Sequence, residues 1–258
     1  MGRNIYRLAI FIIVYTLALQ LSLIADLRDG LVAYWPLDEG RGNVMGDLVA
    51  HHHGDIDKGR GTWTDDAQSG KAFNLRGQSL ITVENTRDLD ELADGFAIAH
   101  WMKPTKPGAI MDKSASDVAR IQWYILGDLR LHWGIGNKFT FGKALPNFGK
   151  WYHVVWSHTP NKATIVYRDG QEVGNSVMGQ TPATLKPMYF GNRLPWEGRS
   201  EWFNGILDEI AFWNRPLSQD EAQEVMEKGI SYLLTVSPRE KVATSWATIR
   251  MRSVARNP

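Results

Sequence analysis

The sequence contains no cysteine among its 258 residues. This absence excludes disulfide bonds, thiol nucleophiles, cysteine-based zinc sites and lipidated cysteines. An excess of one charge is also missing, because 29 Lys and Arg stand against 28 Asp and Glu. Residues 26–230 carry 22 basic and 27 acidic side chains, so the body of the chain is mildly acidic. A nucleic-acid partner requires a basic face, and we therefore expect none.

The common catalytic signatures are absent too. No Gly-x-Ser-x-Gly elbow, phosphate-binding loop or His-Glu-x-x-His helix occurs. The nearest pair of acids on a strand-like run is Asp208-Glu209. Adjacent side chains of an extended strand point to opposite faces, so these two carboxylates are not expected to act together. The sequence predicts a protein that is not an enzyme, although an isolated glutamate acting as an acid stays open.

Tryptophan is abundant, with 11 residues, and it favours strands as well as flat ligand-stacking surfaces. Short apolar runs are separated by turn signals such as Asp94-Gly95 and Asp169-Gly170. The expected strands are Leu31–Leu37, Ser79–Val83, Phe96–Lys103, Ala109–Lys113, Arg120–Leu126, Leu129–Gly134, Trp151–Ser157, Lys162–Arg168, Met188–Gly191 and Phe203–Asn214. About ten short strands at this spacing predict an all-β antiparallel sandwich or barrel.

One helix is predicted near the end of the body. Ser218 and Glu221 match a capping box, and Gly229 is placed to end the helix. After Tyr232 the chain becomes polar and basic, so we expect residues 233–258 to form a loosely ordered tail.

The first 25 residues have the layout of an export signal. Arg3 and Arg7 precede Leu8–Ala25, an uncharged and mostly apolar run. The small residue Ala25 follows a poor cleavage context, and the run approaches the ~20 residues that span a bilayer. A cleaved signal peptide and an uncleaved N-terminal anchor are both open. Either one predicts an extracytoplasmic protein, secreted or at the cell surface, that meets a membrane only through this segment.

Three stretches resemble the LamG-like jelly-roll domains of the concanavalin A-like lectin and glucanase superfamily. They are GLVAYWPLDEGRGNVMGDLVAHHHGDI (30–56), WYHVVWSHTPNKATIVYRDGQEV (151–173) and FNGILDEIAFWNRPLSQDEAQEVMEKG (203–229). The resemblance implies a two-sheet antiparallel jelly roll over residues 26–232, with one short C-terminal helix and with the first and last strands adjacent. Glucanases of this superfamily use a Glu-x-Asp-x-x-Glu strand, which this sequence lacks.

The resemblance also implies a structural calcium near the junction of the first and last strands. Calcium takes six to eight oxygen ligands. The expected ligands are Asp47 and Asp208, which match the family's acidic positions best, with Asn43 and Glu39 beside them. Calcium should then raise the melting temperature. In the alternative, Asp38 and Glu39 are turn residues that bind no ion, and Asp208 faces solvent.

His51-His52-His53 invites a transition-metal interpretation. Neighbouring side chains on an extended chain point to opposite sides, so three consecutive histidines rarely share one ion. We expect a polar loop here.

Trp196, Arg193, Glu197 and Trp63 are the expected ligand-binding residues. Sugar rings stack on exposed aromatic faces, while charged and amide groups bind the hydroxyls. Trp202 is a further candidate outside the obvious core strands. The tryptophans predicted to lie on strands, Trp35, Trp101, Trp151, Trp156 and Trp213, are expected in the core.

These observations together predict an exported, non-catalytic module that binds a glycan or a surface protein and carries a structural calcium. A structural or adhesion unit of a cell-surface assembly is the alternative. A glycoside hydrolase is the least favoured function.

Overall fold

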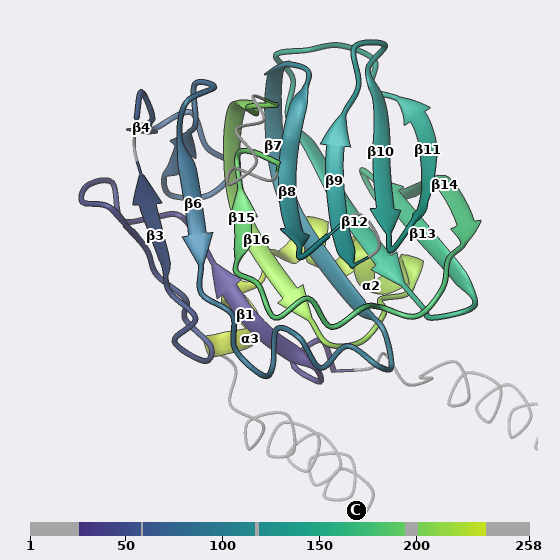
Figure 1. Cartoon of the computed structure of the whole chain (residues 1–258). Helices are drawn as coiled ribbons and strands as arrows, with labels where there is room; N and C mark the ends of the chain where they lie inside the picture. The colour runs from purple at the N-terminus through teal and green to yellow at the C-terminus, as the bar shows by residue number, and fades with distance from the viewer. Residues whose placement is uncertain (1–25, 58, 117–118, 194–200, 236–258) are drawn as a thin grey trace, which may run out of the picture.

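A computed structural model describes residues 26–57, 59–116, 119–193 and 201–235. They form two antiparallel eight-stranded sheets packed face to face, with α2 behind the sheet that contains β16 (Figure 1). The chain is therefore all-β with a jelly-roll sandwich architecture, as the sequence predicted. None of the helices in this described part is long and apolar enough to cross a membrane.

The back sheet contains both the first and the last strand of the body. Its spatial order is β14 (Gln171–Val177), β13 (Ala163–Arg168), β12 (Tyr152–His158), β7 (Phe96–Lys106), β16 (Asn204–Trp213), β5 (Ala72–Asn74) and β4 (Thr62–Thr64). β1 (Leu31–Trp35) lies beside β16, where Leu31 faces Trp213 and Trp35 faces Ile210. The predicted adjacency of first and last strands is confirmed.

The front sheet faces the viewer in Figure 1. Its order is β11 (Lys138–Ala144), β10 (Arg130–Ile135), β9 (Arg120–Ile125), β8 (Gly108–Ser114), β15 (Met188–Phe190), β6 (Leu80–Val83), β3 (Gly54–Asp57) and β2 (Val44–Met45). Strand β11 leaves one edge of this sheet open.

The core lies between the sheets and contains large aromatic side chains from both. Trp35, Trp123, Trp133, Trp156 and Phe190 are almost fully buried in it. A second apolar layer covers the outer face of the back sheet, where α2 (Gln219–Lys228) packs on the strands. Burial of this much aromatic and aliphatic surface is the main favourable term in folding.

All ten predicted strands are present, with ends that coincide with the predicted ones or differ from them by up to three residues. The sequence did not predict the short strands β2, β3, β4 and β5, which belong to segments rich in Gly, Asp and His. Their two to four residues are too few to show an alternating pattern. The helix α2 is confirmed with its capping box, in which Ser218 Oγ accepts from Glu221 N.

The boundary of the tail is corrected. Helix α3 (Ser231–Thr235) extends past the predicted end of the body, and Leu233 is buried in the layer beneath α2. Its carbonyl accepts a 2.6 Å hydrogen bond from Arg28 Nε, which ties the two ends of the body together. The remainder of the predicted tail, residues 236–258, and the predicted export segment, residues 1–25, lie outside the described residues.

A buried lysine holds two loops at one end of the sandwich. Lys113 Nζ on β8 donates to Asn85 Oδ1 at 2.6 Å, Asp90 Oδ1 at 2.9 Å, Thr184 Oγ1 at 2.9 Å and the carbonyl of Lys186 at 2.8 Å. Burial lowers the pKa of Lys113, and the Asp90 carboxylate opposes this shift. The ammonium is compensated by four acceptors, so it can stay charged without water.

Lys113→Met is therefore expected to destabilise the fold by about 3–5 kcal/mol, because it removes the cation that pairs with the Asp90 carboxylate and the donor to three other loop acceptors. Urea unfolding followed by circular dichroism measures this loss. Lys162→Met, at an exposed lysine, is the control and should change the unfolding free energy by less than about 0.5 kcal/mol. Equal stability of the two variants would contradict this role for Lys113.

Candidate functional site

The outer face of the front sheet gathers polar side chains that the alternation of its strands directs away from the core. On β9, Ile121, Trp123 and Ile125 join the core, so Gln122 and Tyr124 lie on the outer face. The pairing registers align one outer position from each of seven strands: Asp55, Thr82, Tyr189, Asp112, Gln122, Gly134 and Phe139. We call this set the front row.

The centre of the front row is a buried polar floor. Asp112 has no exposed surface and Gln122 is 1% exposed. Ser114 Oγ donates to Asp112 Oδ1, and Gln122 Nε2 donates to Ser114 Oγ at 3.4 Å. Polar groups at this depth are costly unless they are hydrogen-bonded, so their presence on an outer face indicates a purpose other than packing.

Two buried atoms of this floor lack a hydrogen-bond partner within the described residues. They are Gln122 Oε1 and His132 Nδ1. Burial, together with the charges of the nearby Arg193 and Arg130, lowers the pKa of His132 to about 4. The imidazole is therefore neutral near pH 7. Unpartnered buried polar atoms cost ~1–3 kcal/mol each, a cost that proteins often accept at functional sites.

A cavity of about 320 Å³ opens beside this floor, and we call it the front cavity. Its lining residues are Pro107, Gly108, Tyr124, Ile125, Leu126, Gly127, Arg193 and Glu201. The Arg193 guanidinium lies 5.6 Å from the ring centroid of Tyr124 and 3.4 Å from Glu201 Oε2. Arg193 Nε is buried and has no acceptor in the part of the chain that the structure describes. The cavity thus combines aromatic surface with a charged donor and a charged acceptor.

The predicted ligand-binding residues divide among different places. Arg193 lines the front cavity. Trp63 lies on β4 of the back sheet, where its ring packs edge-on against Phe73 at 5.0 Å and its Nε1 donates to the Gly42 carbonyl. Trp196 and Glu197 lie outside the described residues. The structure therefore supports Arg193 as a cavity residue and gives Trp63 a packing role.

Of the five tryptophans predicted to lie in the core, three do and two do not. Trp35, Trp156 and Trp213 are fully buried, as expected for core residues. Trp101 and Trp151 are only half-buried, and Trp151 Nε1 donates to Asp66 Oδ1 at 3.1 Å. Trp202 is half-buried beside β8 through a bridge to Ala109.

Sequence reasoning missed the polar floor, although a signal for it was present. In the strand RIQWYI, the apolar residues alternate with Arg120, Gln122 and Tyr124. A strand that buries one face and keeps polar residues on the other marks the solvent side of a sheet. That pattern indicated the outer face, but only the pairing register brings Asp112, Gln122 and Tyr189 into one row.

The four predicted calcium ligands do not form a metal-binding group. Among the described residues, no set of three or more His, Asp or Glu side chains is positioned to hold a metal ion. Asp47 is buried, and its carboxylate accepts hydrogen bonds from the backbone N–H groups of Tyr34, Val49, Ala50 and His52 at 2.8–3.0 Å. Its oxygens are thus taken by amides of its own loop.

The remaining three predicted ligands do not complete a site around Asp47. Glu39 Oε1 accepts from Gly46 N at 2.7 Å, and Asn43 is exposed on the loop before β2. Asp208 Oδ2 accepts from the N–H groups of Gln68 and Ser69. This donor set does not fit a calcium ion, and calcium binding stays a prediction of the sequence alone.

The adjacent acids of β16 do not point to opposite faces, contrary to the sequence-based expectation. A β-bulge interrupts the pairing of β16 with β7 between Asp208 and Ala211, and Glu209 has a φ of 52°. Leu207 and Ile210 both face the core, which leaves Asp208 and Glu209 together on the outer face of the back sheet. Tyr34 Oη donates to Glu209 Oε2 at 2.7 Å there.

Burial governs the titration of this acidic pair. It raises the pKa of Asp208 to about 7, against the two backbone donors that lower it. Burial also raises the pKa of Glu209, and the charge of Asp38 adds to both shifts. Asp208 has no exposed surface and Glu209 is 7% exposed. A polysaccharide could not reach these carboxyl groups in this conformation.

The three consecutive histidines lie in a loop, where the rings of His51 and His53 pack edge-on with centroids 5.7 Å apart. His53 Nδ1 accepts from Asp47 N, while His52 Nε2 lies 3.6 Å from Asp88 Oδ2. His51 adopts a positive φ of 65°. They support the loop that carries Asp47.

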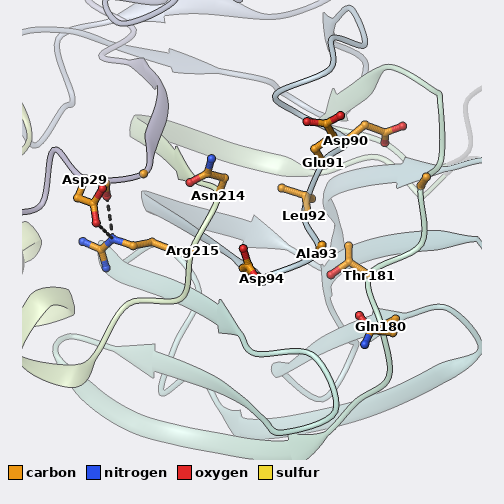
Figure 2. A pocket seen from close by; sticks show the side chains of 12 residues that line it. Asp29, Asp90, Glu91, Leu92, Ala93, Asp94, Gln180, Thr181, Asn214 and Arg215 are labelled. Atoms are coloured by element: carbon orange, nitrogen blue, oxygen red, sulfur yellow. Dashed lines mark hydrogen bonds and ion pairs between the residues drawn. The ribbon is translucent and has the colours of Figure 1, made fainter.

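A larger cavity, about 720 Å³, lies among loops at the end of the sandwich (Figure 2). Arg215 and Asp29 stand on one side of it, and Asp90, Glu91 and Asp94 come from the loop before β7. Asp90 is already held by Lys113. None of the described residues that line this cavity is aromatic, so they offer no stacking surface for a sugar ring.

A family model described as the concanavalin A-like lectin/glucanases superfamily matches residues 75–223. Among solved structures, domain 4 of the extracellular arabinanase AbnA from Geobacillus stearothermophilus, in complex with arabinotriose, is 19% identical with a TM-score of 0.61. The match covers 76% of this chain and 97% of that domain. No curated protein matches the sequence.

Two further structures match this chain over only part of their own length. A botulinum neurotoxin type C structure, described with cell entry that depends on two ganglioside molecules, is 14% identical with a TM-score of 0.59 and covers 79% of this chain and 52% of its own. The Trypanosoma rangeli sialidase is 14% identical with a TM-score of 0.58 and covers 76% of this chain and 32% of its own. At these identities the likeness shows the fold.

Asp47→Ala is expected to lower the free energy of unfolding by about 3 kcal/mol, because four backbone donors lose their acceptor. Asp47→Asn should cost less, since an amide oxygen still accepts. Equilibrium urea unfolding measures both. Asp55→Ala, at an exposed acid of β3, is the control. A wild-type value for Asp47→Ala would show that these amides find other partners.

The Asp208 carboxyl should make stability fall as the pH rises. Its pKa in the fold, about 7, exceeds the ordinary value of 3.8, so the folded state binds this proton more tightly than the unfolded chain. Its stabilising contribution is complete below pH 3.8 and is lost as the pH rises through 7. The difference in unfolding free energy between wild type and Asp208→Asn should therefore change across this interval.

The same titration in excess calcium and in chelator tests the predicted ion. Calcium bound to Asp208 would keep the carboxylate ionised, so the pH dependence would disappear and the melting temperature would rise. Identical profiles in calcium and in chelator would contradict the calcium prediction.

Proposed function

The chain belongs to the concanavalin A-like lectin/glucanases superfamily, and on that premise we propose that it is a non-catalytic module that binds a glycan at the front cavity. The observation that carries the proposal is the grouping of Tyr124, Arg193 and Glu201 around one cavity. Its 320 Å³ lies at the lower end of the ~300–1,000 Å³ range of small-molecule sites, enough for a short saccharide.

The chemistry of the cavity matches sugar recognition. A pyranose or furanose ring presents apolar C–H edges and several hydroxyl groups that both donate and accept. Tyr124 supplies aromatic surface, the Arg193 guanidinium donates, and the Glu201 carboxylate accepts. The buried floor behind Tyr124, with His132 against its ring at 4.1 Å, holds the tyrosine in one orientation. Preorganised side chains lose little entropy on binding.

Likeness to known structures supports a carbohydrate partner. The arabinanase domain was solved with arabinotriose, and the toxin structure is described with gangliosides. The inaccessible acids on β16 support a non-catalytic role, since a glycosidase needs two carboxyl groups in contact with its substrate. Export to the cell exterior is part of the proposal and depends on the N-terminal sequence pattern.

The module is expected to bind oligosaccharides on a glycan array, and Arg193→Ala and Glu201→Gln should each weaken that binding about tenfold, because each removes a polar contact of ~1–1.5 kcal/mol. Isothermal titration with the best array ligand measures the loss. Arg87→Ala is the matched control, since Arg87 forms an exposed pair with Glu91 away from the cavity.

Two outcomes would contradict the proposal. One is wild-type affinity in both cavity variants. The other is a folded wild-type protein that binds no glycan on the array, which would favour the alternative of a structural or adhesion unit with a surface protein as its partner. Release of shortened saccharides during the titration would show that the module is an enzyme.

A further inference from the structure

Two exposed phenylalanines stand on the open edge of the front sheet. Phe139 is 41% exposed and Phe141 is 47% exposed, and both belong to β11. They are two residues apart on one strand, so their side chains share the outer face. Large apolar side chains that stay this exposed on an edge strand carry a cost in solubility and aggregation.

The two rings are fixed in a continuous stack. Phe139 and Phe141 each stack on His132, with centroids 5.2 Å and 4.9 Å apart and interplanar angles of 19° and 28°. The Arg120 guanidinium lies 4.9 Å from the Phe139 centroid, and Arg130 lies 4.5 Å from that of Phe141. We call these five residues the edge ridge.

Gly134 shapes this ridge. It lies opposite Phe139 in the register, and a Cβ on Gly134 would come within 2.5 Å of the Phe139 ring. The phenyl group therefore lies down on the sheet instead of standing off it. Each phenyl ring is contacted by the His132 ring and by one guanidinium group, and these contacts fix the ridge. Its rigidity means that little side-chain entropy is lost when a partner binds.

The surroundings of the ridge are basic. Arg120 and Arg130 flank the rings, and Lys138 and Lys143 are exposed on the same strand. The Asp128 carboxylate pairs with Arg130 at 2.6 Å, and Arg120 is only 6% exposed, so Lys138 and Lys143 supply most of the accessible positive charge. The positive charge of Arg130 and Arg193 also adds to the effect of burial in lowering the pKa of His132.

We propose that the edge ridge docks the protein on an anionic lipid surface, with the Phe139 and Phe141 rings entering the headgroup region and the basic side chains meeting lipid phosphates. Apolar side chains flanked by cations match the two layers of a membrane interface, in which acyl chains lie beneath charged headgroups. Each Lys or Arg near an anionic bilayer strengthens binding about fivefold. A protein partner would need an apolar groove bordered by acidic residues. Nothing in the ridge requires a surface of that shape.

Vesicle co-sedimentation of the full chain tests this docking. The probes are phosphatidylcholine vesicles with and without phosphatidylglycerol. The wild type should bind the anionic vesicles more tightly, and binding should weaken as salt is added. Phe139→Ser/Phe141→Ser should weaken it at least about tenfold, as should Lys138→Glu/Lys143→Glu. Full chains are compared because the apolar segment Leu8–Ala25 then contributes equally to every variant.

Matched controls distinguish binding through the edge ridge from nonspecific binding to vesicles. Leu48→Ser removes another exposed apolar side chain, and Lys106→Glu/Lys162→Glu reverses two exposed charges elsewhere; both should bind as wild type does. The lysine variant keeps the rings in place, so it tests the ridge even if the serine variant unfolds.

Three results would overturn the proposal: equal binding to neutral and anionic vesicles, ridge variants that bind as tightly as wild type, or losses as large in the controls. A concentration-dependent dimer that disappears in the ridge variants would assign the ridge to a second copy of the chain instead. Sedimentation velocity measures that outcome.

Discussion

The pairing of β1 with the C-terminal half of β16 is the constraint on which the back sheet depends. The N-terminal half of β16 pairs with β5, so the strand changes partner along its length, and the bulge at Asp208 and Glu209 lies at that change. Tyr34 then reaches both Glu209 and Ser231, which joins the first strand, the last strand and α3 through one hydroxyl group. The chain closes on itself by way of a polar cluster laid over an apolar core.

The outer faces of the two sheets differ in what covers them. The helices cover much of the outer face of the back sheet, and backbone amides of the 68–69 loop reach Asp208 on the same face. Within the described residues no helix packs on the front sheet, and it is there that a cavity, a polar floor and an aromatic edge occur together. Both proposed interactions, with a glycan and with a membrane, therefore use the outer face of the front sheet.

The sequence predicted the architecture well because strand alternation, turn residues and the capping box at Ser218 are local signals. It could not predict the front row, since Asp112 and Gln122 meet only through long-range register. The orientation of Asp208 and Glu209 was predicted wrongly because a bulge reverses the rule that neighbours alternate. The sequence also could not show that the Asp47 carboxylate accepts four backbone N–H groups, because a carboxylate that binds amides and one that binds a cation are the same residue type, and only the fold distinguishes them.

The short distance between the ends of the body has a mechanical consequence. The described body begins at Asp26 and ends at Thr235, and Arg28 contacts the carbonyl of Leu233. Tension between these two points would first detach α3 and α2, which follow β16 in the chain, and would then pull on the end of the ladder where Leu31 faces Trp213. The hydrogen bonds between β1 and β16 would then break one after another, because two antiparallel strands that are pulled from the same end separate by peeling and not by shearing. A module held at both ends would yield at low force, whereas one held at a single end would carry no tension through its sheets.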